Sequence, residues 1–413
     1  MEVIVYIFDK KVGVLYDDGG VIRFEYESEF IDSKLNISPL KLPFKTDMYS
    51  NYDDKYFTTL AGVFFDSLPD KFGTKVIQRY YESKNISTKD LTTLQKLMFI
   101  GKRGMGALEY KPSEKIVDEI AIKETLEIRS MYEFSKKIIK GEPIQAVKEM
   151  LLFMDSGASA GGARAKAVIG WNRDLNKIVS GAGNLEEGYE HWLVKFDGYD
   201  DNRKSTDFTK LEYLYMQMAK DCNIEVPDIE LIVSDNLSHF AIKRFDRVGE
   251  EKIHMHSLSS LVHVNFNEPL HYSYDEALRV VRYMTRDMRA VEELYKRALF
   301  NVIARNQDDH AKNTSFLMDK SGKWKLSPAY DITYANGQGF TRNHQMSILG
   351  KVNDFKYEDL IKLGTIAEIK EARAQEILSN IIKIVSEFKD RAKALKIRKD
   401  LISLVSDDLR LFY

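Results

Sequence analysis

The chain has 413 residues, of which 44% are hydrophobic and 30% charged, enough for two or three domains with sizeable cores. Its formal net charge of −2 gives no overall basic field and therefore argues against direct binding of nucleic acid. The single cysteine excludes a disulfide framework, and the lack of any run of eighteen apolar residues excludes a membrane-spanning helix.

The first residues, Met1–Tyr6, contain no basic region and no long apolar stretch. They are typical of a first strand and not of a signal peptide. We therefore expect a cytoplasmic protein.

Gly, Pro and Asp residues divide the chain into four parts. The first part alternates short strands with turns and then predicts helices around 54–72 and 87–100. A charged helical connector follows, then a β-rich unit with one helix, and finally a region of long amphipathic helices. The predicted domains are 1–110, 111–154, 155–247 and 248–413.

A run of very small residues, 155–164, leads into a predicted strand at 165–171. Small side chains let backbone N–H groups approach phosphate oxygens closely, so this run is a candidate phosphate-binding loop. It is not a Walker A loop, because no Gly-Lys-Ser/Thr follows at the required spacing. The alternative is a flexible hinge between two domains.

Lys195 lies inside an apolar, β-rich run at 191–196. Burial of an ammonium group without a partner is costly, so Lys195 should face a cleft and meet an anion. In kinases this anion is the nucleotide phosphate, together with a Glu from the next helix. Here that residue would be Glu212, in a predicted helix at 208–222. The alternative is an exposed lysine on an edge strand.

Near the end of the chain, Asp308 precedes Asn313 by five residues, which is the spacing of a kinase catalytic loop. The adjacent Asp309 does not have this spacing. A predicted hairpin at 314–326 would return Asp331 close to Asn313. Carboxylate and carbonyl oxygens are the ligands that Mg²⁺ prefers. The alternative is a polar loop that only caps a helix and starts a hairpin.

The order of these motifs resembles the HipA family of serine/threonine kinases, the toxin half of bacterial toxin–antitoxin pairs. The motifs are Ser159–Arg164, Lys195, Lys243–Arg247, Asn306–Asn313, Pro328–Asp331 and Leu349–Lys351. The N-terminal part is similar too, in Val12–Leu15, Phe24–Tyr26, Ile37–Leu40 and Phe64–Asp70. The resemblance therefore covers nearly the whole chain.

The resemblance implies a role for each matching residue. Asp308 would be the catalytic base, and Asn313 and Asp331 would be the Mg²⁺ ligands. Ser159 would be an autophosphorylated loop serine, with Ser156 as the fallback. The residues expected to bind ATP are Ser159, Ala160, Gly161, Gly162, Ala163, Lys166, Lys195, Lys243, Arg244, Phe245 and Lys312. Phe245 would lie at the hinge near the adenine.

Two positions depart from the family pattern. The family usually has Arg after the catalytic Asp, where this chain has Asp309. It often has Pro before the loop Lys, where this chain has Ala165. The first departure leaves the charge pairing around the catalytic loop open, and the second affects only the stiffness of the small-residue loop.

The implied fold is α+β and bilobal, like that of protein kinases, with a β-rich part that includes the HipA N-terminal subdomain and an all-helical C-terminal lobe. The implied cofactors are ATP and Mg²⁺, and the acceptor is a protein Ser or Thr.

The implied partner is a small helix-turn-helix antitoxin (HipB-like), with DNA contacted only through it. Some family members phosphorylate an aminoacyl-tRNA synthetase, which makes such an enzyme a candidate substrate. Two other classes stay open: a small-molecule phosphotransferase of the aminoglycoside type, and a non-catalytic co-repressor of a DNA-binding antitoxin.

Overall fold

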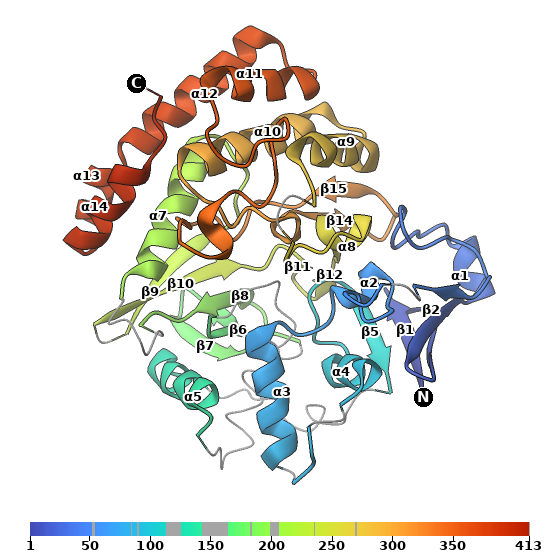
Figure 1. Ribbon diagram of the computed structural model, residues 1–413. Coiled ribbons are helices and arrows are strands. Elements are labelled where there is room, and N and C mark those ends of the chain that lie inside the picture. The colour runs from blue at the N-terminus through green and yellow to red at the C-terminus, as the bar shows by residue number, and fades with distance from the viewer. Residues whose placement is uncertain are drawn as a thin grey trace.

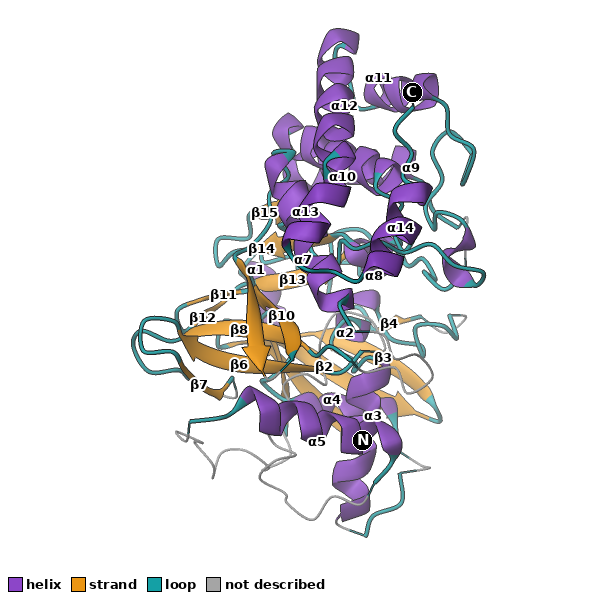
Figure 2. Ribbon diagram, turned by 90° about the vertical axis from the view of Figure 1, so that its left-hand side faces the viewer, coloured by secondary structure: helices purple, strands orange, loops and turns teal. Residues whose placement is uncertain are grey.

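The computed structural model describes residues 1–51, 54–83, 85–88, 91–112, 125–142, 164–181, 184–198, 206–234, 236–268 and 271–412. The fold is α+β: two five-stranded sheets lie on one side, and most helices of the C-terminal half gather on the other (Figures 1 and 2). Among the described residues, no helix combines the length and the apolar character needed to cross a membrane.

The N-terminal region forms an antiparallel sheet with the strand order β4-β3-β2-β1-β5. Alternate residues of β1 are buried, as in a sheet that turns one face to a core. The strands are β1 (Glu2–Ile7), β2 (Lys10–Asp18), β3 (Val21–Tyr26), β4 (Tyr49–Ser50) and β5 (Leu108–Lys111). The helices that share this core are α1 (Ser28–Asp32), α2 (Gly62–Phe65) and α4 (Thr93–Ile100).

Two predicted helices of this region have other bounds in the structure. No continuous helix runs through 54–72, because Thr58 and Thr59 have φ values of 50° and 61°, which interrupt a helical backbone. A separate helix, α3 (Lys71–Ser83), begins where that prediction ends. Helix α4 starts well after residue 87, because a capping box at Thr92 fixes its first turn. Both predictions are therefore wrong in their bounds.

A second antiparallel sheet has the order β7-β6-β8-β10-β9. Its strands are β6 (Lys166–Asn172), β7 (Lys177–Ser180), β8 (Glu190–Lys195), β9 (Ile229–Ser234) and β10 (Leu237–Lys243). One face packs against α7 (Phe208–Asp221), which confirms the helix predicted there.

The other face of the second sheet is covered by α5 (Ile128–Lys140) together with α3 from the N-terminal region (Figures 1 and 2). Val76 and Ile77 of α3 share one core with Ala167 and Trp192 of the sheet. The N-terminal region therefore supplies part of the core of the second sheet. Of the predicted helical connector, the structure describes α5 and its flanks.

The C-terminal lobe is not all-helical as expected, because it combines helices with a small sheet. Strands β13 (His254–Ser257), β14 (Ser315–Met318) and β15 (Trp324–Leu326) are antiparallel, so the predicted hairpin is confirmed. A ribbon of β11 (Arg247–Val248) and β12 (Glu251–Lys252) precedes them. The helices are α8 (Leu258–Val262), α9 (Tyr274–Thr285), α10 (Met288–Ile303), α11 (Tyr357–Ile366), α12 (Glu371–Ser386), α13 (Phe388–Ala394) and α14 (Lys399–Asp408), with 3₁₀ turns η2 (Ala311–Asn313) and η3 (Phe340–Arg342).

Buried hydrogen bonds join the N-terminal region to the C-terminal lobe. Asp66 accepts them from His256 Nδ1 (2.7 Å) and from the N–H (2.8 Å) and Oγ (2.7 Å) of Ser257. The other ring nitrogen of His256 lies 3.0 Å from Ser38 Oγ. These contacts anchor β13, and β13 pairs with β14 next to the predicted catalytic loop.

A second junction, which we call the Asp246 clamp, holds the loop before β5 against the hinge after β10. Asp246 accepts two hydrogen bonds from Arg244 (2.9 and 2.8 Å), one from Arg247 (2.8 Å) and one from the N–H of Gly106 (2.7 Å). Both arginines also donate to the carbonyl of Gly104. Burial alone would raise the pKa of Asp246, but the two guanidinium groups outweigh it and hold the pKa well below its usual range.

Candidate active site

A pocket lies between the second sheet and the C-terminal lobe. Most of its walls are apolar. Of the five charged side chains that line it, Glu212 and Asp331 both contact Lys195. The other lining residues are Met105, Leu193, Phe240, Ile242, Lys243, Arg244, Phe245, Met255 and Tyr330. An apolar slot with a few convergent charges suits a ligand that has a flat ring and a phosphate tail.

Lys195, at the end of β8, connects three parts of the chain. Its Nζ lies 2.5 Å from Glu212 Oε1 on α7 and 2.5 Å from Asp331 Oδ1 after the β14–β15 hairpin. Burial alone would lower the pKa of Lys195, but the two carboxylates raise it. Burial alone would raise the pKa of Asp331, and the attraction of Lys195 keeps that pKa below its usual value. Both groups are therefore charged at neutral pH.

Asp308 and Asn313 lie in the loop between α10 and β14. Asn313 Nδ2 donates to the carbonyl of Asp308 (3.0 Å), which turns the amide oxygen of Asn313 away from that carbonyl. The Asp308 side chain is 42% exposed and lies 3.6 Å from His310 Nε2. Burial raises the pKa of Asp308, His310 opposes this, and the negative charge of Asp331 adds to it. An accessible carboxylate with raised proton affinity suits a general base.

Asp309 has a different environment from its neighbour. Its side chain is fully buried and accepts hydrogen bonds from Tyr274 Oη (2.9 Å), His344 Nδ1 (2.7 Å) and the N–H of Gln345 (2.7 Å). These bonds tie the loop to α9 and to the segment before α11. Asp309 therefore anchors the predicted catalytic loop from behind through these hydrogen bonds.

The donor set fits a magnesium ion held partly by the protein. The Asp331 carboxylate and the Asn313 amide oxygen are both hard oxygen ligands, as Mg²⁺ prefers. Within the described part of the chain, no group of three or more His, Cys, Asp or Glu side chains is placed to hold a metal. A site of this kind would take its remaining ligands from phosphate oxygens and water.

Two of the lysines expected to bind ATP lie toward the N-terminal region. Lys166 Nζ is 2.6 Å from Asp70 Oδ2, and the side chains are only 2% and 3% exposed. Asp70 also accepts a hydrogen bond from the N–H of Gly73 in the first turn of α3. Lys312 Nζ lies 5.2 Å from the centre of the Phe266 ring. Burial lowers the pKa of Lys312, and nearby carboxylates including Asp70 oppose this effect.

The three hinge residues expected to bind ATP, 243–245, make different contacts. Lys243 forms ion pairs with Glu190 and, at 3.8 Å, with Asp228, and Arg244 belongs to the Asp246 clamp. Phe245 stacks at 5.6 Å, tilted by 32°, on Tyr330 in the wall of the pocket. Phe245 is thus the hinge residue with its ring in the pocket.

The small-residue loop, with Ser156, Ser159, Ala160, Gly161, Gly162 and Ala163, lies outside the described residues. Its last residue, Arg164, is described and lies with Nη1 4.0 Å from Glu212 Oε2. The chain therefore enters β6 beside the Lys195–Glu212 pair.

Two residues of this region were not selected from the sequence. Asp70 stands just before a helix, where an Asp is more often a cap than an ion-pair partner, although it closes one of the matching N-terminal motifs. Tyr330 contacts Ser315 Oγ (2.6 Å) and donates to the carbonyl of Lys312 (2.8 Å), so it links the hairpin to the catalytic loop. Its place directly before Asp331 was the only sequence signal.

The chain resembles known proteins over most of its length. Residues 158–388 match the family model of the HipA-like C-terminal domain, and residues 3–111 match that of the HipA N-terminal domain. The computed fold is similar to that of HipA from Shewanella oneidensis in its complex with HipB and operator DNA, with a TM-score of 0.69 at 16% identity over 98% of this chain and 94% of that one.

Curated relatives are more distant in sequence. The protein named "Putative kinase Y4dM" of Sinorhizobium fredii is 25% identical over 201 residues, which are 44% of this chain and 47% of that protein. The serine/threonine-protein kinase toxin HipA of Shewanella oneidensis is 24% identical over 161 residues, 34% of this chain and 36% of that protein. The chain thus spans about half the length of the first of these relatives and less of the second.

Proposed function

Because the chain belongs to the HipA family, we propose that it is an ATP- and Mg²⁺-dependent kinase that phosphorylates a serine or threonine of a protein. The observation that carries this proposal is the meeting of Lys195, Glu212 and Asp331 in one pocket. Asp308 and Asn313 lie one hairpin away from it. A strand lysine paired with a helix glutamate, next to an aspartate placed to hold Mg²⁺, is the arrangement found in protein kinases.

In this proposal, the protein acts by positioning and by charge. The adenine would lie between Phe245 and the apolar walls of the pocket, with the phosphates directed toward Lys195. Asn313 and Asp331 would hold Mg²⁺, which when bound neutralises charge on the transferred phosphoryl group. Asp308 would accept the proton of the attacking hydroxyl, which its exposure and raised pKa favour.

The biological setting is proposed from the relatives. The similar Shewanella HipA is solved in a complex with HipB and operator DNA. By analogy, this chain would act in the cytoplasm as a growth-inhibiting toxin and bind a HipB-like helix-turn-helix antitoxin, with DNA contacted through that partner. An aminoacyl-tRNA synthetase is a candidate substrate, and Ser159, or else Ser156, is a candidate autophosphorylation site.

The test is transfer of labelled γ-phosphate from Mg·ATP by the purified full-length protein, to itself and to cell proteins. We expect Asp308→Ala to lower transfer ~10²-fold or more, as for loss of a general base. The exposed Asp407 on α14 provides the matched control, and Asp407→Ala should keep full activity. Label that never reaches protein in the wild type would overturn the proposal in favour of a small-molecule kinase or a silent co-repressor. Intact mass distinguishes phosphate from AMP.

A further inference from the structure

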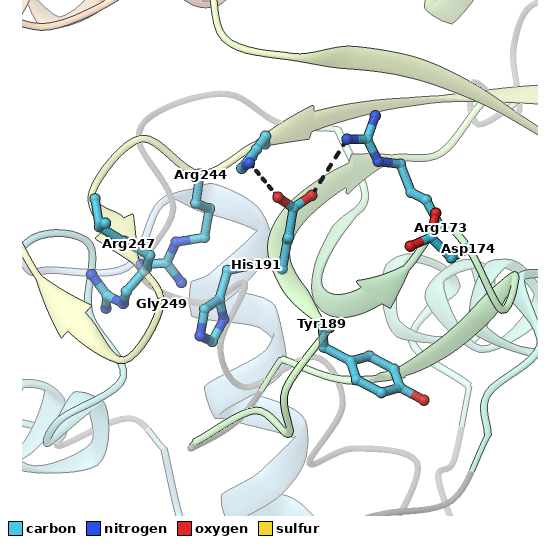
Figure 3. A pocket seen from close by; sticks show the side chains of 11 residues that line it. Arg173, Asp174, Tyr189, His191, Arg244, Arg247 and Gly249 are labelled. Atoms are coloured by element: carbon cyan, nitrogen blue, oxygen red, sulfur yellow. Dashed lines mark hydrogen bonds and ion pairs between the residues drawn. The ribbon is translucent and has the colours of Figure 1, made fainter.

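A second pocket lies behind the hinge, on the side away from the nucleotide pocket. It is lined by the β6–β7 turn with Arg173, by the start of β8 with Tyr189 and His191, and by the hinge with Arg244 and Arg247 (Figure 3). It encloses about 480 Å³, within the range of small-molecule sites. It lies at the ends of β6 and β8 that are opposite to the small-residue loop, because Trp171 pairs with Glu190 there and Lys166 pairs with Lys195 at the other end.

The lining of this hinge pocket has an excess of positive charge. Four cationic side chains line it, against two carboxylates: Arg173, Lys243, Arg244, Arg247, Asp174 and Glu190. Glu190 is shared between Lys243 and Arg173, the latter at 3.7 Å. Lys243 also lies 3.8 Å from Asp228, and Arg173 lies 3.6 Å from Glu230. The two other arginines share the single carboxylate of Asp246 behind the wall. A bound anion would therefore be attracted even though each cation already has an acidic neighbour.

His191 supplies an independent sign of a ligand. Its side chain is only 8% exposed, yet its Nδ1 has no hydrogen-bond partner among the residues that the structure describes. Burial, together with the positive charges of Arg244 and Arg247, lowers the pKa of His191 to about 3, so the ring is neutral at pH 7. Buried ring nitrogens of His239 and His254 also lack a partner among the described residues, but the His191 ring lines the cavity. The ring lies between the two arginines and Tyr189, at the wall of the cavity (Figure 3).

We propose that the hinge pocket binds a small phosphorylated molecule. Arg173 and the hinge arginines would donate hydrogen bonds to the phosphate oxygens. The neutral His191 ring would donate one more from Nδ1–H, which requires the ring to turn, because Nδ1 is fully buried in this structure. Tyr189 would pack against the non-phosphate part of the ligand. A purely structural ion-pair network would explain the arginines but not a cavity of this size next to an unsatisfied buried imidazole.

A ligand in the hinge pocket could also affect the nucleotide pocket, because the two pockets share lining residues. Lys243 and Arg244 line both cavities, and the N–H of Arg244 donates to the carbonyl of His191 (2.8 Å). A ligand bound in the hinge pocket would thus affect the end of β10 that faces the proposed adenine site. The binding itself needs no phosphoryl transfer, so it can be tested independently of the proposed kinase activity.

The experiment titrates the full-length protein with inorganic pyrophosphate, without ATP and in the presence of EDTA. Calorimetry measures affinity, and NMR follows the histidine ring nitrogens, with the His191 signals assigned from His191→Gln. We expect saturable binding that moves the His191 ring signals. Arg173→Met should weaken binding about tenfold, as expected for one lost charged contact. The exposed Lys177 on the same hairpin does not line the pocket, so Lys177→Met should leave affinity unchanged.

Arg173 is a safe position for this test, because its side chain is 43% exposed and its ion pairs are long, at 3.7 and 3.6 Å. Its contact with the Trp192 ring is checked by comparing thermal unfolding of the variant with the wild type. Unmoved His191 signals at millimolar pyrophosphate, or equal affinity in Arg173→Met, would overturn the proposal.

Two further titrations identify the source of the phosphate. Uridine 5′-monophosphate that binds more tightly than pyrophosphate, with the gain lost in Tyr189→Leu, would support a nucleotide as ligand. Binding of pyrophosphate alone would support an inorganic or simple phosphate. A phosphoserine peptide that moves the His191 signals when neither small anion does would overturn the assignment to a small molecule.

Discussion

Two buried lysine–aspartate contacts hold different regions of this protein together, and they are built differently. Lys195 has two carboxylates at 2.5 Å, and its partner Asp331 is still 24% exposed. Lys166 meets Asp70 at 2.6 Å with both side chains almost fully buried. The first contact therefore has a surplus of acid and access to solvent, as a site that exchanges partners requires. The second is closed to solvent, and it fastens α3 to the second sheet.

The largest effect on activity should come from the contacts of Lys195. Lys195→Met should lower kcat/KM for phosphoryl transfer by ~10²–10³, because it removes the charge that we propose to be directed at the nucleotide phosphates. Lys177→Met, at an exposed position, is the matched control. Steady-state kinetics with labelled ATP measure the change. A Lys195→Met enzyme with normal activity would show that this contact is only structural.

The Lys166–Asp70 contact should affect the stability of the fold. Asp70→Asn should lower the free energy of unfolding by about 3 kcal/mol, because it takes the Asp70 carboxylate away from a buried ammonium group while Asn can still cap α3. The double variant Asp70→Asn/Lys166→Met should recover much of this loss, since it buries no uncompensated charge. Urea unfolding of the three variants gives the coupling energy. Additive single effects would mean that the contact is not an interacting pair.

The Asp246 clamp should contribute less to stability than the Lys166–Asp70 contact, and its contribution should depend on pH. Asp246→Asn should cost about 2 kcal/mol at pH 7, since it weakens hydrogen bonds to two guanidinium groups. Because the pKa of Asp246 is lowered in the folded state, this stability is present above the usual Asp pKa of ~3.9 and is lost as pH falls through the folded value. Unfolding curves of wild type and variant should therefore converge in acid. A constant difference would contradict this.

The smallest expected effect concerns the acid limb of the pH–rate profile. Asp308 must be ionised to accept a proton, and its pKa is raised, so kcat/KM should fall with decreasing pH at values above the usual Asp range. His310 opposes this shift, so His310→Gln should move the limb to higher pH by less than about one unit. Rates measured across pH test both statements. A limb that moves to lower pH in His310→Gln would contradict the statement that His310 lowers the pKa of Asp308.

The parts that could be predicted from the sequence depend on short spacings. The hairpin after Asn313 follows from two short strand-like segments around the turn at 319–322, and the Lys195–Glu212 contact follows from a strand followed by a helix. The partner of Lys166 could not be predicted, because Asp70 is far away in sequence and local rules assign it to a cap. The helix predicted at 54–72 failed because two threonines adopt a left-handed backbone that no apolar pattern reveals.

The position of α3 has a consequence for synthesis on the ribosome. Its apolar face is covered by β6 and β8, so it lacks this cover until Lys195 has been translated. At ~5–20 residues per second, the interval of about 110 residues after Ser83 lasts roughly 5–20 s. During that time the nascent chain exposes an aromatic-rich helix. A gene fragment that ends near residue 111 would make this state permanent, so the first family-matched segment is an incomplete folding unit and should aggregate when expressed alone.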